Sequence, residues 1–447
     1  MVPKHIEDLS RILRGVALIA ARAAADSQLI KRAVKGERHV RERRQAEERK
    51  AEVRRKLRER RVPSSPLGRV MGFAGLGASL VYGTVADQVG QFFRGPREGQ
   101  PASHNAYLTE QNAERLANAL CRMRGAALKL GQMLSIQDEN VLPPQFQAAL
   151  ERVRAGADVM PRRQLEKVLR DELGDEWSSR VAQFDHEPLA AASIGQVHSA
   201  VLHDGRRVVL KIQYPGVARS IESDVDNLLR IIHVANILPK GMYVEAAAKV
   251  AKKELAMECD YEYEFASQRR FKALIEADPE FREVFHVPDV VAELSSKRVL
   301  ASELVPGVHI DKVKDMPQDV RNDVGTRLLK LTLRELFEWR FMQTDPNWGN
   351  FLYDEETDTL NLIDFGAARS YPKPFVDDYL RMVHACATRN KDEVILRSVR
   401  LGFLTGDEPD VMLEAHTEAG FIVGMPFAAE GTQLFFDTFD KYKFDSS

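Results

Sequence analysis

Three polar side chains in the second half of the chain have the types and spacing that phosphate chemistry requires. Asp345 lies in a Gln-Thr-Asp-Pro-Asn sequence, Asn350 follows five residues later, and Asp364 opens an Asp-Phe-Gly sequence. Phosphoryl transfer needs an acidic group that faces the attacking hydroxyl and two oxygen ligands for Mg²⁺. We therefore interpret Asp345 as the candidate catalytic group, and Asn350 and Asp364 as candidate metal ligands.

The residues between these groups predict how they meet. Phe351–Tyr353 and Leu360–Ile363 have the composition of strands, and they flank the turn-forming residues 354–359. A hairpin returns the chain to its start, so we expect Asn350 and Asp364 to lie side by side. The alternative is an ordinary hairpin with acidic flanks, which Asp-Phe-Gly alone would favour. The upstream Asp and Asn at kinase spacing argue against it.

A phosphate site also needs a cation, and Lys211 is the candidate. It lies in the second of two predicted strands, Val197–Leu202 and Arg207–Gln213, which flank an Asp-Gly turn signal. Reflecting this hairpin about the turn places Lys211 roughly opposite His198. A lysine inside an apolar strand needs a partner such as phosphate oxygens or a helix carboxylate. The alternative is an edge-strand lysine whose ammonium reaches water.

A loop rich in alanine precedes the first of these strands. Protein kinases use glycines there, so that backbone N–H groups can approach phosphates. Here alanine fills most of those positions and Gly195 remains, so we expect a stiffer loop with altered nucleotide affinity. Glu303 and Val305, at the end of the predicted N-lobe, complete the nucleotide-binding candidates. The loop candidates are Ala190, Ala191, Ala192, Ser193, Ile194, Gly195, Gln196 and Val197.

Together with two further motifs, these residues resemble the UbiB family of atypical kinases, most closely its mitochondrial branch that supports coenzyme Q (ubiquinone) biosynthesis. Lys-Leu-Gly-Gln at 129–132 resembles the family's Lys-x-Gly-Gln signature, and Glu-Cys-Asp at 258–260 its Glu-x-Asp signature. Residues 341–348 resemble the mitochondrial version of the catalytic motif. The resemblance covers roughly residues 100 to 420, with the motifs in the family's order.

The resemblance implies a role for each matching residue, with ATP and Mg²⁺ as cofactors. Lys211 resembles the ATP-binding lysine, and Glu264 resembles its helix partner, although Glu258 is close enough to compete. Asp345 matches the catalytic aspartate, and Asn350 and Asp364 match the metal ligands. The insert that folds over the active site contributes Lys129 and Gln132, faced by Glu258 and Asp260.

Helical periodicity agrees with part of this assignment. Residues 112–134 predict an amphipathic helix, in which Lys129 and Gln132 share one face because they are three residues apart. The alternative is a solvated lysine on an ordinary amphipathic helix. The charge-rich helix expected over Glu245–Phe271 carries Glu258 and Glu264 six residues apart, so spacing does not decide which of them pairs with Lys211.

Two features of protein kinases are missing. Gln343 and Thr344 replace the His-Arg that precedes the catalytic aspartate, and no Ala-Pro-Glu follows the Asp-Phe-Gly sequence. The chain instead runs through residues 367–373 into a helical pattern. The usual platform for a protein substrate is therefore not expected. ATP hydrolysis or phosphorylation of a small molecule fits better than phosphorylation of proteins in trans.

The N-terminal segment suggests a membrane partner. The chain of 447 residues has a formal net charge of −2, which excludes a global attraction to nucleic acid. Residues 31–61, however, hold fifteen lysines and arginines against six glutamates and no aromatic residues. Residues 70–86 form an uncharged stretch whose length is close to the minimum for spanning a bilayer of ~30 Å. This stretch has three possible interpretations: a membrane span, an interfacial helix or a buried helix. The adjoining basic segment favours membrane association, with anionic lipid as the partner.

Localisation rests on the resemblance. The three cysteines are dispersed, with neither metal spacing nor a disulfide framework, which suits a reducing compartment. Arginines and alanines in residues 1–29 are typical of mitochondrial targeting, but Glu7, Asp8 and Asp26 weaken that pattern. We expect a mitochondrial protein associated with the inner membrane. The expected partners are coenzyme Q biosynthetic enzymes or lipid intermediates, and a second copy of the chain.

We expect an α+β, two-lobed, protein-kinase-like fold with a helical N-terminal extension packed on the N-lobe. The expected regions are a basic segment at 1–62, a glycine-rich membrane-associated helix region at 63–95, a helical extension with Lys-x-Gly-Gln at 100–160, an N-lobe at 161–305 and a C-lobe at 306–447. Relatives usually continue further, so the C-lobe is expected to be truncated, as a short isoform or a fragment.

The expected function is that of an atypical kinase-like ATPase that binds Mg-ATP and supports coenzyme Q biosynthesis at a membrane. Its Lys-x-Gly-Gln insert limits protein phosphorylation in trans. One alternative is a small-molecule or lipid kinase that uses the same site. The other is a nucleotide-binding scaffold without turnover, against which the intact Lys211, Asp345, Asn350 and Asp364 argue.

Overall fold

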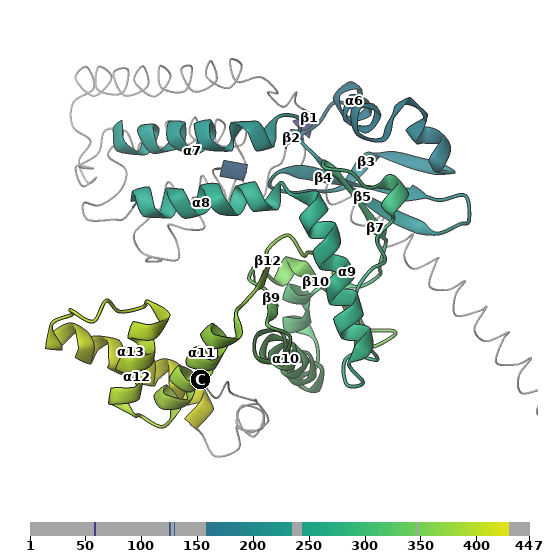
Figure 1. Ribbon diagram of the computed structural model, residues 1–447. Helices are drawn as coiled ribbons and strands as arrows, with labels where there is room; N and C mark the ends of the chain where they lie inside the picture. Colours follow the sequence, from purple (N-terminus) through teal and green to yellow (C-terminus); the bar gives the residue numbers. More distant parts are fainter. Residues whose placement is uncertain are drawn as a thin grey trace, which may run out of the picture.

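A computed structural model describes residues 58–59, 125–126, 129, 158–234, 244–345 and 347–428 of the chain. Figure 1 shows an antiparallel sheet with helices against it, and a second, mainly helical part that ends in three helices. Short strands lie between the two parts. The predicted membrane-associated region at 63–95, most of the extension at 100–160 and the C-terminal tail lie outside the described residues.

The N-lobe is built on a four-stranded sheet in the order β3-β4-β5-β7, with antiparallel neighbours. Side chains alternate along β5, so that Val208, Leu210 and Ile212 are buried in the core while Lys211 lies on the opposite face. Helix α6 packs Leu165 into the same core. The bounds are α6 (Arg162–Leu173), β3 (Gln183–Ala191), β4 (Gly195–Val201), β5 (Arg207–Gln213) and β7 (Val299–Glu303).

The predicted β4–β5 hairpin is confirmed, but its register differs by one residue. Lys211 pairs with Val197, and His198 pairs with Leu210. The reason is the turn: the N–H of Leu202 bonds to the carbonyl of Arg206, so the ladder is centred on Asp204 rather than between Asp204 and Gly205. His198 consequently points into the buried layer, and burial lowers its pKa to about 4.

Three helices lie between β5 and β7 in the chain: α7 (Val217–Val234), α8 (Val244–Glu258) and α9 (Tyr261–Ala277). Helices α7 and α8 lie side by side and extend away from the sheet, while α9 runs from the sheet toward the second part (Figure 1). The prediction of one helix over Glu245–Phe271 is wrong. The helix is interrupted at Asp260, whose carboxylate accepts a hydrogen bond from the Tyr263 N–H and caps α9.

The C-lobe contains a second four-stranded sheet in the order β6-β11-β10-β8. The hairpin predicted after Asn350 is confirmed: Phe351 pairs with Leu362, and the Ile363 N–H bonds to the carbonyl of Asn350. These register contacts bring Asn350 beside the residue before Asp364. The bounds are β6 (Phe285–His286), β8 (Val308–His309), β10 (Phe351–Asp354) and β11 (Thr359–Leu362).

A separate two-stranded sheet holds the residues that flank the two aspartates. Strand β9 (Phe341–Gln343) pairs antiparallel with β12 (Ala368–Ser370). Helix α9 also contacts β12. The Tyr263 hydroxyl donates to the Ala368 carbonyl at 2.7 Å, and Arg270 donates to the Ser370 hydroxyl at 2.9 Å.

The remaining helices form the far end of the C-lobe. Helix α10 continues into a π-helical turn, Arg334–Trp339, that leads to β9. Within the described part of the chain, no helix has the length and hydropathy to span a bilayer. The bounds are α10 (Gln318–Leu333), α11 (Lys373–Ala387), α12 (Lys391–Leu401) and α13 (Asp410–Ala428); two short strands, β1 (Arg58–Glu59) and β2 (Asp158–Val159), pair in parallel.

Both predicted lobes of the α+β, kinase-like fold are therefore present. The arrangement puts β5, α9 and the β10–β11 hairpin around one space, and the candidate residues come from these elements.

Candidate active site

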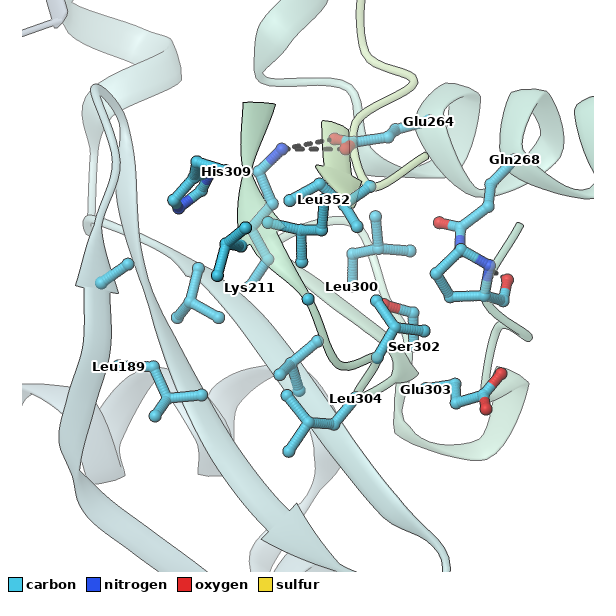
Figure 2. A pocket seen from close by; sticks show the side chains of 18 of the residues that line it. Leu189, Lys211, Glu264, Gln268, Leu300, Ser302, Glu303, Leu304, His309 and Leu352 are labelled. Carbon is cyan, nitrogen blue, oxygen red and sulfur yellow. Dashed lines mark hydrogen bonds and ion pairs between the residues drawn. The ribbon is translucent and has the colours of Figure 1, made fainter. Parts of the chain in front are cut away.

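A cavity of about 380 Å³ lies between the N-lobe sheet and the C-lobe strands. Its size suits a nucleotide base and sugar, because small-molecule pockets start at roughly 300 Å³. Leu189 and Leu304 line one part, and Lys211 reaches Glu264 at the other (Figure 2). The apolar wall includes Leu189, Val197, Leu300, Leu304, Leu352 and Ile363. The apolar wall would suit an apolar group, and Lys211 supplies a positive charge at the other end of the cavity.

The Lys211 ammonium is held by two carboxylates. Its Nζ lies 2.8 and 3.1 Å from the two carboxylate oxygens of Glu264, and 3.1 Å from Oδ2 of Asp364. Burial disfavours the ammonium, but Asp364 and Glu264 outweigh it and hold the pKa of Lys211 well above its usual value. Glu264, rather than Glu258, is therefore the partner of Lys211. The helix break at Asp260 puts the two glutamates on different helices.

The alanine-rich loop divides between the pocket and the core. Ala190 and Val197 line the cavity, whereas Ile194 and Gln196 are buried away from it. Gln196 bonds to His198 Nε2 at 2.7 Å and accepts the Met160 N–H at 3.0 Å. Ala191 ends β3, and Ala192 lies in the turn between β3 and β4, where its N–H bonds to the Gly195 carbonyl.

Gly195 has a steric role at the start of β4. A Cβ there would lie 2.4 Å from the Ile212 carbonyl oxygen, so the strands approach too closely for any side chain. The predicted residues Glu303 and Val305 both line the cavity, and the Glu303 carboxylate lies 3.1 Å from His286 Nε2.

Asp345 and Asn350 are tied together through the backbone. The Asn350 side-chain N–H donates to the Asp345 carbonyl at 3.1 Å, which leaves the amide oxygen of Asn350 directed elsewhere. Burial raises the pKa of the Asp345 carboxyl, Lys129 opposes the shift, and Asp364 adds to it. The Asp364 carboxylate accepts the Gly366 N–H at 3.1 Å, so its second oxygen is the one near Lys211.

This donor set fits Mg²⁺ in the manner of a nucleotide site. Carboxylate and amide oxygens are hard donors, and Mg²⁺ is commonly held by one or two carboxylates together with substrate phosphates and water. Among the described residues, no group of three or more His, Cys, Asp and Glu side chains could hold a metal ion without such help. Asp364 and Asn350 would therefore hold the ion jointly with phosphate oxygens.

Lys129 reaches this region from the N-terminal extension. Its ammonium lies 2.8 Å from the Glu258 carboxylate, whose other oxygen accepts the Ser193 hydroxyl at 3.1 Å. Burial disfavours the charge, but Glu258, Asp345 and Glu254 raise the pKa of Lys129. A Cβ on Gly125 would lie 3.4 Å from the Ser193 carbonyl, so Gly125 lies close against the loop. Gln132 lies outside the described residues, and Asp260 is exposed as the cap of α9.

Sequence reasoning missed three side chains of the site. The Tyr261 ring lies 5.3 Å from Lys211 Nζ, and Gln268 lines the cavity and donates to the Pro288 carbonyl at 2.8 Å. Both lie on the face of α9 that carries Glu264, at helical spacings of three and four residues, which is a signal that could have identified them. The third is Gln343, whose side chain contacts both aspartate segments.

Comparison with known proteins agrees with this geometry. A family model, the ABC1 atypical kinase-like domain, matches residues 152–398. The atypical kinase COQ8B, mitochondrial, of Rattus norvegicus is 48% identical over 380 residues, which are 85% of this chain and 71% of that protein. The atypical kinase COQ8, mitochondrial, of Saccharomyces cerevisiae is 36% identical over 431 residues, which are 95% of this chain and 84% of that protein.

Among solved structures, an Rv3197–erythromycin complex from Mycobacterium tuberculosis is 29% identical, with a TM-score of 0.45 over 70% of this chain and 80% of that chain. The family model alone covers more than half of the chain. The family resemblance drawn from the motifs is confirmed, and the chain is an enzyme of the kinase or ATPase phosphotransferase type that belongs to the ABC1 atypical kinase-like family, the UbiB group.

Proposed function

We propose that the chain is a kinase-like ATPase that binds Mg-ATP and supports coenzyme Q biosynthesis at a mitochondrial membrane. The observation that carries the nucleotide chemistry is the ammonium of Lys211, held between Glu264 and Asp364 at the end of an apolar cavity. The mitochondrial setting is supported by the names of the rat and yeast relatives. Coenzyme Q is supported by the motif resemblance.

Each residue has one part in the proposed mechanism. The apolar wall binds the base, and Lys211 neutralises charge on the phosphates. Asn350 and Asp364 hold Mg²⁺, which supplies positive charge at the phosphate oxygens when it is bound. Asp345 orients the attacking water or hydroxyl. Its raised pKa makes the Asp345 carboxylate a better proton acceptor than an ordinary aspartate.

Lys129 is proposed to restrict access to this centre. It is buried, it is held by Glu258, and its charge acts on Asp345. A side chain in that place limits the room for a large acceptor. The chain between Gly366 and α11 is also short and belongs largely to β12, which favours water or a small molecule over a protein segment as acceptor.

The test is phosphate release from ATP by the full chain, with and without vesicles that contain anionic lipid, with Asp364→Asn as the inactive control. We expect release that the vesicles stimulate and that is lost in the variant. Transfer of the phosphoryl group to a molecule in a lipid extract, instead of to water, would favour the small-molecule kinase. Mg-nucleotide binding without any transfer would favour the scaffold, and Mg-nucleotide binding by Asp364→Asn equal to that of the parent would overturn the metal assignment.

A further inference from the structure

Gln343 is buried at the end of β9, two residues before Asp345. Its side-chain oxygen lies 3.4 Å from the Asp345 N–H, and its side-chain N–H donates to the Asp364 carbonyl at 2.9 Å. One amide therefore contacts the backbone of both aspartates.

The chemistry of the two partners explains why the residue is an amide. A backbone N–H only donates and a backbone carbonyl only accepts, so the side chain between them must accept on one side and donate on the other. Glutamine does both with one rigid group. A carboxylate would place an acceptor against the Asp364 carbonyl, and leaving that half-buried carbonyl unpaired costs free energy.

The surroundings of Gln343 hold the amide in place. Its backbone N–H donates to the buried Glu335 carboxyl group at 3.1 Å, and Gln343 pairs with Ala368 in the β9–β12 ladder. The next residue repeats the link: the Thr344 hydroxyl donates to the Ala367 carbonyl at 2.7 Å. The strand before Asp345 is therefore bonded to the segment after Asp364 at consecutive residues.

The opposite sides of both aspartates are held as well. The Asp345 carbonyl accepts from Asn350, and the Asp364 carboxylate is bonded to Lys211 and to the Gly366 N–H. What Gln343 adds is the link between the two backbones. Without it, the Asp364 carbonyl loses its bond to the strand before Asp345, and the remaining links lie beyond Asp364, at Ala367 and Ala368.

We propose that Gln343 is a positioning residue that sets the separation of Asp345 from Asp364, and so aligns the attacking group with the metal-bound phosphate. This proposal rests on the proposed phosphoryl chemistry of the site. Alignment is costly to lose, since a displacement of about 1 Å lowers turnover by as much as ~100-fold.

The experiment compares Gln343→Glu and Gln343→His in the full chain, with Gln318→Glu as matched control. Gln318 is an exposed glutamine on α10, so it undergoes the same chemical change far from the site. Histidine keeps one donor and one acceptor, whereas glutamate keeps only acceptors. The measurements are kcat and KM for ATP, the unfolding temperature, and the Mg²⁺ concentration that gives half of the ADP-induced stabilisation.

For Gln343→Glu we expect kcat to fall at least about tenfold while KM for ATP changes less than about threefold, because the cavity and Lys211 are untouched. Gln343→His should recover part of the lost kcat, and Gln318→Glu should match the parent. A kcat within about threefold of the parent in Gln343→Glu overturns the proposal. Equal losses of kcat and unfolding temperature in both Gln343 variants also overturn it, because they indicate a structural role only.

The Mg²⁺ measurement separates this proposal from the proposed function. If the parent binds Mg-ADP but releases no phosphate from ATP, the proposal of ATPase activity is wrong. The role of Gln343 is then tested by the Mg²⁺ measurement alone. A half-saturating Mg²⁺ concentration raised about tenfold in Gln343→Glu would still support positioning of Asp364, and an unchanged value would overturn it.

Discussion

The partners of Lys211 leave the site with excess negative charge. One ammonium lies within 3.1 Å of two carboxylates, and Asp345 adds a third carboxylate to the same electrostatic neighbourhood. ATP phosphates would be repelled by such a centre in the absence of another cation. Nucleotide binding and Mg²⁺ binding should therefore be strongly coupled, as the Mg²⁺ measurements on Gln343 assume.

Glu335 is a second residue whose charge is set by its surroundings. It is buried beneath β9, and burial raises its pKa from 4.5 to about 8, with the Gln343 N–H opposing the shift. The folded chain thus keeps this proton between pH 4.5 and about 8, whereas the unfolded chain releases it. Its contribution to stability is complete below pH 4.5 and is lost as the pH rises through about 8.

We therefore predict that Glu335→Gln has a higher free energy of unfolding relative to the parent at pH 8.5 than it has relative to the parent at pH 5. The uncharged amide can still accept the Gln343 N–H and has no proton to lose. The difference is on the order of 1 kcal/mol for each unit by which the pKa is raised. Thermal unfolding at both pH values measures it, with Glu283→Gln as control because that carboxylate is exposed. If variant and parent differ in their free energy of unfolding by the same amount at both pH values, the prediction is wrong.

At the scale of elements, the close approach of β4 and β5 determines where Lys211 lies. Gly195 faces the Ile212 backbone, next to Lys211 in the strand, and the two strands stay in register through the whole hairpin. A side chain at Gly195 would push this end of β4 away from β5. The position of the lysine thus depends on a residue that bears no functional group.

Gly195→Ala should accordingly destabilise the chain and weaken nucleotide binding. The added Cβ would meet a backbone oxygen at 2.4 Å, and such overpacking costs roughly 1–3 kcal/mol. The matched control is Gly325→Ala on α10, where the new Cβ has no neighbour within 4 Å and alanine favours the helix by up to about 1 kcal/mol. Unfolding temperatures should shift in opposite directions, and a stabilising Gly195→Ala would refute the close-approach argument.

Local elements were predictable from the sequence and their mutual placement was not. The hairpin that brings Asn350 beside Asp364 is encoded by two short strands and the turn between them, so its register follows from nearby residues. The helix break was missed because a single cap, Asp260, interrupts a continuous charge-rich pattern. Without the break, spacing gave no means to assign Glu264 to Lys211. The two-fold use of Gln343 is a tertiary contact with no local signal.

At the scale of the whole molecule, the site belongs to both lobes. The sheet contributes Lys211, α9 contributes Glu264, and the C-lobe contributes Asp345, Asn350 and Asp364. The kinase-like architecture was predictable because the motifs occur in a family order along the chain. The packing of the N-terminal extension was predicted from the resemblance, and the described residues include the contact of Lys129 with Glu258 and the close approach of Gly125 to Ser193.

Because the cavity is lined by residues of both lobes, Mg-ADP bound there should stabilise them together. Ligand at about 100 times its Kd adds ~2.7 kcal/mol to the free energy of unfolding, which corresponds to several degrees. Lys211→Met should abolish most of this shift, since it removes the cation that pairs with Glu264 and Asp364. Lys167→Met, which changes an exposed lysine on α6, should keep it. An unchanged shift in Lys211→Met would contradict the assignment of the cavity.

The segment after Asp364 is fixed on both sides. Strand β12 is paired with β9 along one edge and bonded to Tyr263 and Arg270 of α9 along the other, and α11 starts almost at once. Many kinases are controlled by a long segment here that is ordered only after phosphorylation. In this chain the segment is already ordered as a strand of a sheet. Its output would follow the supply of nucleotide and acceptor, as a metabolic enzyme's does, rather than a signalling event.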